Sequence, residues 1–105
     1  MEEPNLSYVY NMSGGNKEFE QKLIGIMKTE FPEEKKEYFE NIAAGNFSEV
    51  AKNVHKLKHK IIILGLEKSY ALAARYEDNL LKDSVEGKED FEAVLQNMTK
   101  FLDSL

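Results

Sequence analysis

Glycine and proline residues divide this chain into segments of helix length, and that punctuation constrains the fold more than any other feature. Within each segment, apolar residues recur three and four positions apart, which is the spacing of one face of an α-helix. The alternation typical of strands is nearly absent. The dividing positions are Gly14-Gly15, Pro32, Gly45-Asn46, Gly65 and Gly87. The pattern therefore predicts an all-α fold.

Local signals place the helix boundaries. Pro32, followed by two glutamates, is typical of a first helical turn and predicts that a new helix begins there. Asn46, with Glu49 three residues later, is typical of a capping box that opens the next helix. The expected helices are a short one near 6–12 and longer ones over 16–30, from Pro32 to Gly45, from Asn46 to Gly65, from about 67 to 83, and after Gly87.

Short loops between amphipathic helices favour antiparallel neighbours. We therefore expect an antiparallel up-and-down four-helix bundle with a short extra N-terminal helix. A length of 105 residues fits a single domain over residues 1–105. The expected oligomeric state is a monomer.

Composition and charge exclude several classes of function. The chain has no cysteine, so it can form neither a disulfide nor a thiolate metal site, which fits a reducing compartment. Its first residues do not resemble a secretory signal, and its longest apolar run, Ile61–Leu66, is too short to span a membrane. The net charge of −5 argues against binding to nucleic acid or to an anionic membrane. We therefore expect a cytoplasmic protein.

The segment "VHKLKHKIIILGLE", residues 54–67, places two histidines among lysines in an otherwise acidic chain. Between Ala51 and Leu66 there is no acidic residue. Such a local basic patch suggests a small acidic target. Lys56 and Lys60 are expected to face solvent away from the histidines.

Helix geometry predicts where these side chains point. With 100° per residue, His55 lies about 130° and His59 roughly 170° from the centre of the expected buried stripe. Both imidazoles should face water, with Lys58 beside His55 on the rim. The buried stripe is Val50, Val54, Leu57, Ile61 and Leu64.

Three apolar residues, Ile62, Ile63 and Leu66, also fall on the histidine side of this helix. An apolar patch beside exposed histidines suggests a docking surface. Alternatively, the short N-terminal helix covers Ile62 or Ile63.

An exposed, neutral imidazole is a competent nucleophile toward an activated phosphoryl group. A neighbouring ammonium group can stabilise the negative charge of the product. His55 and Lys58 supply this pair on one helix.

The segment "HKLKHKIIILG", residues 55–65, resembles the signature of histidine-containing phosphotransfer (HPt) domains. That signature is a histidine, leucine two later, lysine three later, and Leu-Gly nine and ten later. His55, Leu57, Lys58, Leu64 and Gly65 fall in this register. The resemblance extends along the chain, from the "MSGGN" turn to the helices that flank the motif.

The resemblance implies that His55 accepts a phosphoryl group from the aspartyl phosphate of one receiver domain and passes it to another. Lys58 would help neutralise that group. The expected partners are receiver domains of hybrid histidine kinases and response regulators, with Mg²⁺ held by the receiver and no cofactor on this chain. No Gly-rich nucleotide loop is present, which argues for a carrier without autokinase activity. The candidate docking rim is Ser48, Lys52, His59, Ile62, Ile63 and Leu66.

His59 departs from the HPt pattern, in which this position is usually a glycine that leaves room above the phosphorylated ring. A second imidazole here will crowd His55 and affects the expected transfer rate and range of partners. His59→Gly is expected to retain or speed the phosphorylation of His55.

Two other functions remain open. Two histidines at i and i+4 can ligate a metal, but a functional site needs a third ligand and the local lysines repel a cation. The alternative to phosphotransfer is a helical protein–protein interaction module in which both histidines are ordinary surface residues.

Overall fold

A computed structural model describes residues 2–105 of the chain and confirms the all-α class. Within these residues there are helices and connecting turns but no strand. The helices are α1 (Ser7–Ser13), α2 (Lys17–Ala43), α3 (Phe47–Ile63), α4 (Glu67–Leu81) and α5 (Lys88–Asp103).

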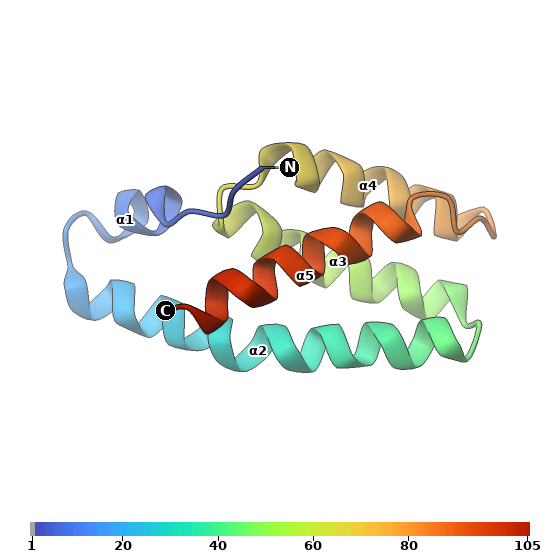
Figure 1. Cartoon of the computed structure of the whole chain (residues 1–105), viewed down its shortest axis with the longest axis horizontal. Coiled ribbons are helices and arrows are strands. Elements are labelled where there is room, and N and C mark those ends of the chain that lie inside the picture. Colours follow the sequence, from blue (N-terminus) through green and yellow to red (C-terminus); the bar gives the residue numbers. More distant parts are fainter. Residues whose placement is uncertain (1) are drawn as a thin grey trace.

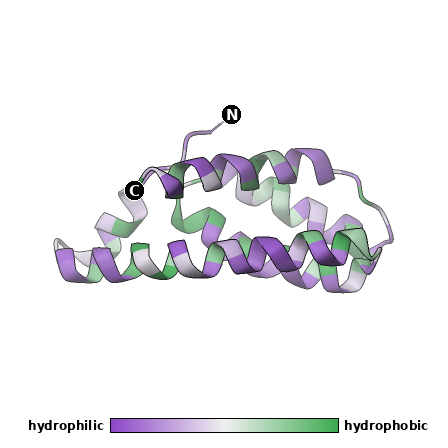
Figure 2. Cartoon of the chain, turned by 60° about the horizontal axis from the view of Figure 1, so that its bottom comes forward, coloured by the Kyte–Doolittle hydropathy of each residue, from purple (hydrophilic) through white to green (hydrophobic). Residues whose placement is uncertain are grey.

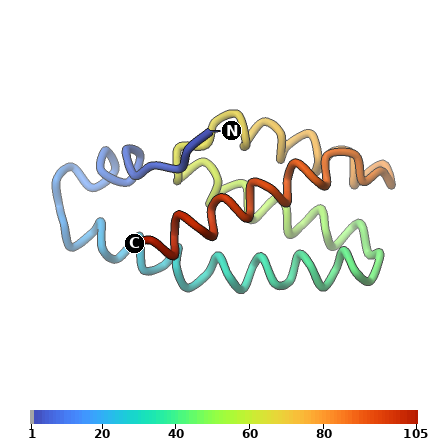
Figure 3. Tube along the Cα trace, viewed as in Figure 1, coloured from blue at the N-terminus to red at the C-terminus, as the bar shows by residue number. Residues whose placement is uncertain are grey.

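The four long helices lie lengthwise beside one another, and each runs opposite to the one before it (Figure 1). α3 packs against both α2 and α4, while α5 packs against α4 and α2. The short α1 contacts α2 at the end of the molecule where α2 begins. In Figure 3, the N-terminus lies beside the turn between α3 and α4, and the C-terminus lies near the first half of α2.

The predicted buried stripe of α3 is confirmed. Val50, Val54, Leu57 and Ile61 are fully buried, and Leu64 is 1% exposed. Figure 2 shows apolar and polar residues alternating around every long helix, as expected of helices with one face in a shared core. Exposed positions of α3 are therefore set by the same periodicity that sets its buried ones.

The prediction that a new helix begins at Pro32 is wrong, because α2 runs without a break from Lys17 to Ala43. A proline inside a helix removes one backbone hydrogen bond and costs about 3 kcal/mol. Phe31 and Tyr38, on either side of the proline, are both buried in the core. Their packing explains why the helix continues through a residue that usually marks a helix start.

The predicted capping box at Asn46 is also wrong. Asn46 is the N-cap residue of α3, as predicted, but its side chain accepts no hydrogen bond from a backbone N–H of the first turn; its Oδ1 instead accepts one from the Ser48 side chain, Oγ, at 3.3 Å. Glu49 pairs with Lys52 at 3.1 Å. Side-chain capping does occur at α2, where Asn16 Oδ1 accepts from the Phe19 backbone N–H at 3.0 Å.

An N-terminal arm, residues 2–6, crosses the turn between α3 and α4. The Glu2 carboxylate accepts hydrogen bonds from the backbone N–H groups of Lys68 and Ser69 at 2.9 and 2.8 Å. Burial alone would raise the pKa of Glu2, but these bonds at the start of α4 lower it below the usual value. The arm therefore supplies the cap that the first turn of α4 lacks.

Gly65 makes the close approach of this arm possible. Its φ of +77° belongs to the left-handed region, and a Cβ there would lie 2.6 Å from Asn5 Nδ2. The Asn5 backbone N–H donates to the Leu64 carbonyl at 2.9 Å. A side chain at residue 65 would force the Asn5 side chain to move and would strain the backbone at this positive φ.

Candidate phosphoacceptor site

The outer face of α3 carries an exposed row of polar side chains. Ser48, Lys52, His55 and His59 are all exposed, as the helix geometry predicts for the two histidines. The His55 side chain is 58% exposed, so its ring is open to a large partner. These four residues recur at intervals of three and four along one side of the helix.

The structure adds an acidic residue that the local sequence does not reveal. Glu77, on α4, reaches across to α3, where its Oε2 lies 3.1 Å from His55 Nδ1. Its Oε1 lies 2.8 Å from Lys58 Nζ. One carboxylate therefore joins the two residues that the sequence selects as acceptor and helper.

This contact defines the tautomer of His55. A carboxylate only accepts hydrogen bonds, so in the neutral ring Nδ1 carries the proton and Nε2 carries the lone pair. Nε2 lies on the opposite edge of the ring, and within residues 2–105 no hydrogen bond engages it. The ring nitrogen with the lone pair is thus not the one that contacts α4.

The Lys58 side chain is more buried than expected of a residue on the rim of the helix. Its side chain is 14% exposed, and Nζ lies 5.5 Å from the centre of the Tyr70 ring. The contact with Glu77 Oε1 is short, but its angles are not those of a hydrogen bond, so it acts as an ion pair. Lys58 neutralises Glu77 without competing for the oxygen that His55 uses.

His59 stands beside His55, as its position one turn later requires. The two ring centroids are 5.5 Å apart, and the ring planes meet at 89°, edge to face. The space that a glycine would leave open at this position is therefore occupied by a second imidazole.

The apolar part of the predicted docking rim needs correction. Leu66 is fully buried, so the expectation that it lies on the surface beside the histidines is wrong. The helix ends at Ile63, and the chain turns at Gly65, so helical geometry no longer applies to residue 66. Ile62 and Ile63 are half-buried, and Ile63 packs against the core.

The expectation that Lys60 faces solvent is wrong as well. Its side chain is 12% exposed, and Nζ lies 2.9 Å from Glu30 and 3.2 Å from Glu34, both on α2. Burial would lower the pKa of Lys60, but the two carboxylates raise it above the usual value. Together with the pairs of Lys52 and Lys58, this contact neutralises most of the basic patch that the sequence suggests.

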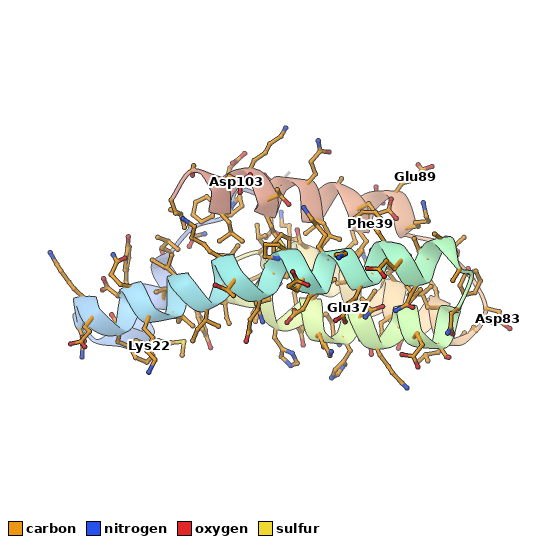
Figure 4. The ribbon with its side chains drawn as sticks, turned by 90° about the horizontal axis from the view of Figure 1, so that it is seen from below. Lys22, Glu37, Phe39, Asp83, Glu89 and Asp103 are labelled. Atoms are coloured by element: carbon orange, nitrogen blue, oxygen red, sulfur yellow. The ribbon has the colours of Figure 1, made fainter. Side chains whose placement is uncertain are left out.

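A second surface feature is a groove between α2 and α5. Phe39 and Glu89, on those two helices, mark its position in Figure 4. Phe39, Ala93 and Leu95 supply its apolar lining, and Lys35 and Glu92 are among its polar residues. The groove is formed by the two helices that do not carry His55, Lys58 or Glu77.

Within residues 2–105, no cluster of three or more histidine, cysteine, aspartate or glutamate residues is arranged to hold a metal ion. In the same part of the chain, no helix is long and apolar enough to cross a membrane. Comparisons of the sequence and fold with protein-family models, curated proteins and solved structures found no match.

Proposed function

We propose that this protein is a phosphoryl carrier of the HPt type, with His55 as the phosphorylated residue. In this proposal, α2 to α5 form an antiparallel up-and-down four-helix bundle, and α1 is the short extra helix. The protein acts as a monomer between receiver domains, with its acceptor on the exposed face of α3.

The observation that carries the proposal is the orientation of His55. The ring is solvent-exposed, its Nδ1 contacts a carboxylate at 3.1 Å, and that carboxylate is paired with Lys58. A solvated surface histidine does not need such an arrangement. A nucleophile does, because only one tautomer presents a lone pair at Nε2.

The chemistry balances without a proton donor or acceptor from outside the site. The Nε2 lone pair attacks the phosphorus of an aspartyl phosphate, the N–P bond forms, and the P–O bond to the aspartate breaks. The electron pair of that bond leaves with the aspartate carboxylate. The ring then carries a positive charge with Nδ1 still protonated, and Glu77 stabilises that charge. Transfer to a second aspartate reverses these steps.

Lys58 and the exposed row of α3 have supporting roles in this proposal. The Lys58 ammonium group lies within one helical turn of His55 and offers a positive charge to the phosphoryl oxygens. Ser48, Lys52, His59 and Ile62 form the rim that a receiver domain would contact. Mg²⁺ would be bound by the receiver, whose carboxylates suit it, and not by this chain.

The experiment is phosphotransfer from a receiver domain loaded with radioactive phosphate. We expect acid-labile, base-stable label on the wild-type protein, located at His55 by peptide mapping. A panel of receivers from one organism should be tested, because cognate pairs transfer fastest. Absence of label with every receiver would contradict the proposal and favour the alternative of a helical interaction module without phosphotransfer.

A further inference from the structure

His59 has no part in the proposed transfer chemistry, although it stands beside the acceptor. Within residues 2–105, neither of its ring nitrogens has a hydrogen-bond partner. Histidines at i and i+4 on an exposed helix can bind one divalent metal ion, provided that the rings approach correctly and the charge around them permits it. The structure shows both the separation of the two rings and the charged groups around them.

The ring geometry fits a shared ion. Two imidazoles bound to a tetrahedral ion, with metal–nitrogen distances of about 2.1 Å, place their ring centroids roughly 5–5.5 Å apart. The His55 and His59 centroids are 5.5 Å apart. The separation of the two exposed rings therefore matches that of two imidazoles that share one ion.

Glu77 prepares His55 for this role as well. A metal-binding histidine usually donates its other ring N–H to a carboxylate, which fixes the tautomer and makes the ring a better ligand. The His55 Nδ1 contact with Glu77 Oε2, at 3.1 Å, has this form. The same lone pair at Nε2 therefore serves as nucleophile or as metal ligand, but not as both at once.

The charge around the pair is lower than the sequence suggests. Lys52, Lys58 and Lys60 contact Glu49, Glu77 and the Glu30–Glu34 pair, respectively. Three of the four lysines that would repel a cation are thus matched by carboxylates. The electrostatic objection to a metal at this helix is largely removed.

We propose that His55 and His59 together bind a borderline divalent transition-metal ion, Zn²⁺ or Cu²⁺, and that the bound ion blocks phosphorylation of His55. Imidazole nitrogen suits these ions, whereas Mg²⁺ prefers oxygen ligands and does not compete. Two protein ligands leave the other positions to water, so the ion is exchangeable and regulatory in character. The blocking effect rests on the proposed function, but the binding does not.

Binding is tested with the full chain and the metal alone. Titration of Cu²⁺ should give one ion per chain, with an electron paramagnetic resonance spectrum that shows two imidazole nitrogens. His59→Ala should weaken binding tenfold or more. The matched control combines Lys56→His with His59→Ala, which keeps two histidines but places them 100° apart on the helix. Wild-type affinity in either variant would overturn the metal site.

The blocking effect is tested by phosphotransfer with and without Zn²⁺. Zn²⁺ at a concentration that saturates the site should slow labelling of the wild-type protein at least tenfold, and a chelator should restore it. In the His59→Ala protein, Zn²⁺ should slow labelling much less, relative to the rate of the same variant without metal. This comparison excludes an effect of Zn²⁺ on the receiver. Equal inhibition of both proteins would overturn the blocking effect. If no labelling occurs even without metal, the proposed function fails, while the copper spectra still decide the site.

Discussion

Two lysines two residues apart on α3 form ion pairs of similar burial but with different surroundings. Lys58 and Lys60 are similarly buried, with 14% and 12% of their side chains exposed. Lys60 lies between two carboxylates of α2, whereas Lys58 shares one carboxylate of α4 with an exposed imidazole. Both arrangements join helices; under the proposed function, the second also orients the nucleophile. Two lysines with similar burial and similar ion pairs can therefore differ in role. The difference lies in whether the paired carboxylate also contacts another side chain, as Glu77 contacts His55.

The largest expected effect comes from removing the imidazole. His55→Gln should abolish phosphoryl acceptance, a loss of at least a thousandfold in labelling, because glutamine has no comparable nucleophile. The exposed position predicts a change of less than about 0.5 kcal/mol in the free energy of unfolding. Radioactive transfer and urea unfolding measure the two quantities. Labelling of the variant at the wild-type rate would mean that another residue carries the phosphoryl group.

Next in size is the effect of the shared carboxylate. Glu77→Gln should slow labelling of His55 about 10- to 100-fold, because the ring loses both a fixed tautomer and the charge that stabilises its phosphorylated form. The ¹⁵N chemical shifts of the ring report the tautomer directly. They should show protonated Nδ1 in the wild-type protein and a mixture of tautomers in the variant. If the ¹⁵N chemical shifts and the rate of phosphotransfer were both unchanged in the variant, Glu77 would have only a structural role, like Glu34.

Lys60 should affect stability without affecting transfer. Lys60→Met leaves Glu34, whose side chain is 18% exposed, without its partner and should cost about 1–2 kcal/mol in the free energy of unfolding. The rate of labelling should stay within twofold of the wild-type rate. Lys58→Met is the matched variant, and it should lower both stability and transfer. If Lys60→Met slowed transfer as much as Lys58→Met, the distinction between the two lysines would be lost.

The smallest effect is a pH dependence of the Lys60 contribution. Because the folded protein raises the pKa of Lys60, this contribution is fully present below the unfolded value of about 10.4 and disappears as pH rises through the folded pKa. The gap in stability between wild type and Lys60→Met should therefore be constant from pH 7 to 9 and shrink above about pH 10.5. Urea midpoints at these pH values test it. A gap that grows with pH would contradict the assigned cause.

Periodicity within single helices predicted much of this molecule. It predicted the helical class, the buried stripe of α3 and the exposure of both histidines, because these depend only on the spacing of residues along one helix. The local boundary signal failed at Pro32, where core packing on both sides of the proline outweighs it. Periodicity failed at Leu66, where the chain has already left the helix.

The site could be predicted only in part, because its decisive carboxylate comes from another helix. The spacing on α3 identifies His55 and Lys58 but does not indicate which residue of α4 faces them. A weak signal existed: Glu77 lies four residues after buried Ala73 and three before buried Leu80, on the edge of an apolar stripe. An acid at such a position needs a partner across the helix interface. Glu34, between buried Phe31 and Tyr38, follows the same pattern and pairs with Lys60.

Under the proposed function, the contact between His55 and Glu77 also makes the reactivity of His55 conditional on correct packing of α3 against α4. A slip of one residue along a helix moves a side chain by about 1.5 Å and turns it by about 100° around the axis, so the 3.1 Å contact would be lost. An isolated peptide of α3 would contain the whole histidine motif and still lack the group that selects its tautomer. Under the proposed function, only a chain whose α3 and α4 are correctly packed would therefore present a competent acceptor.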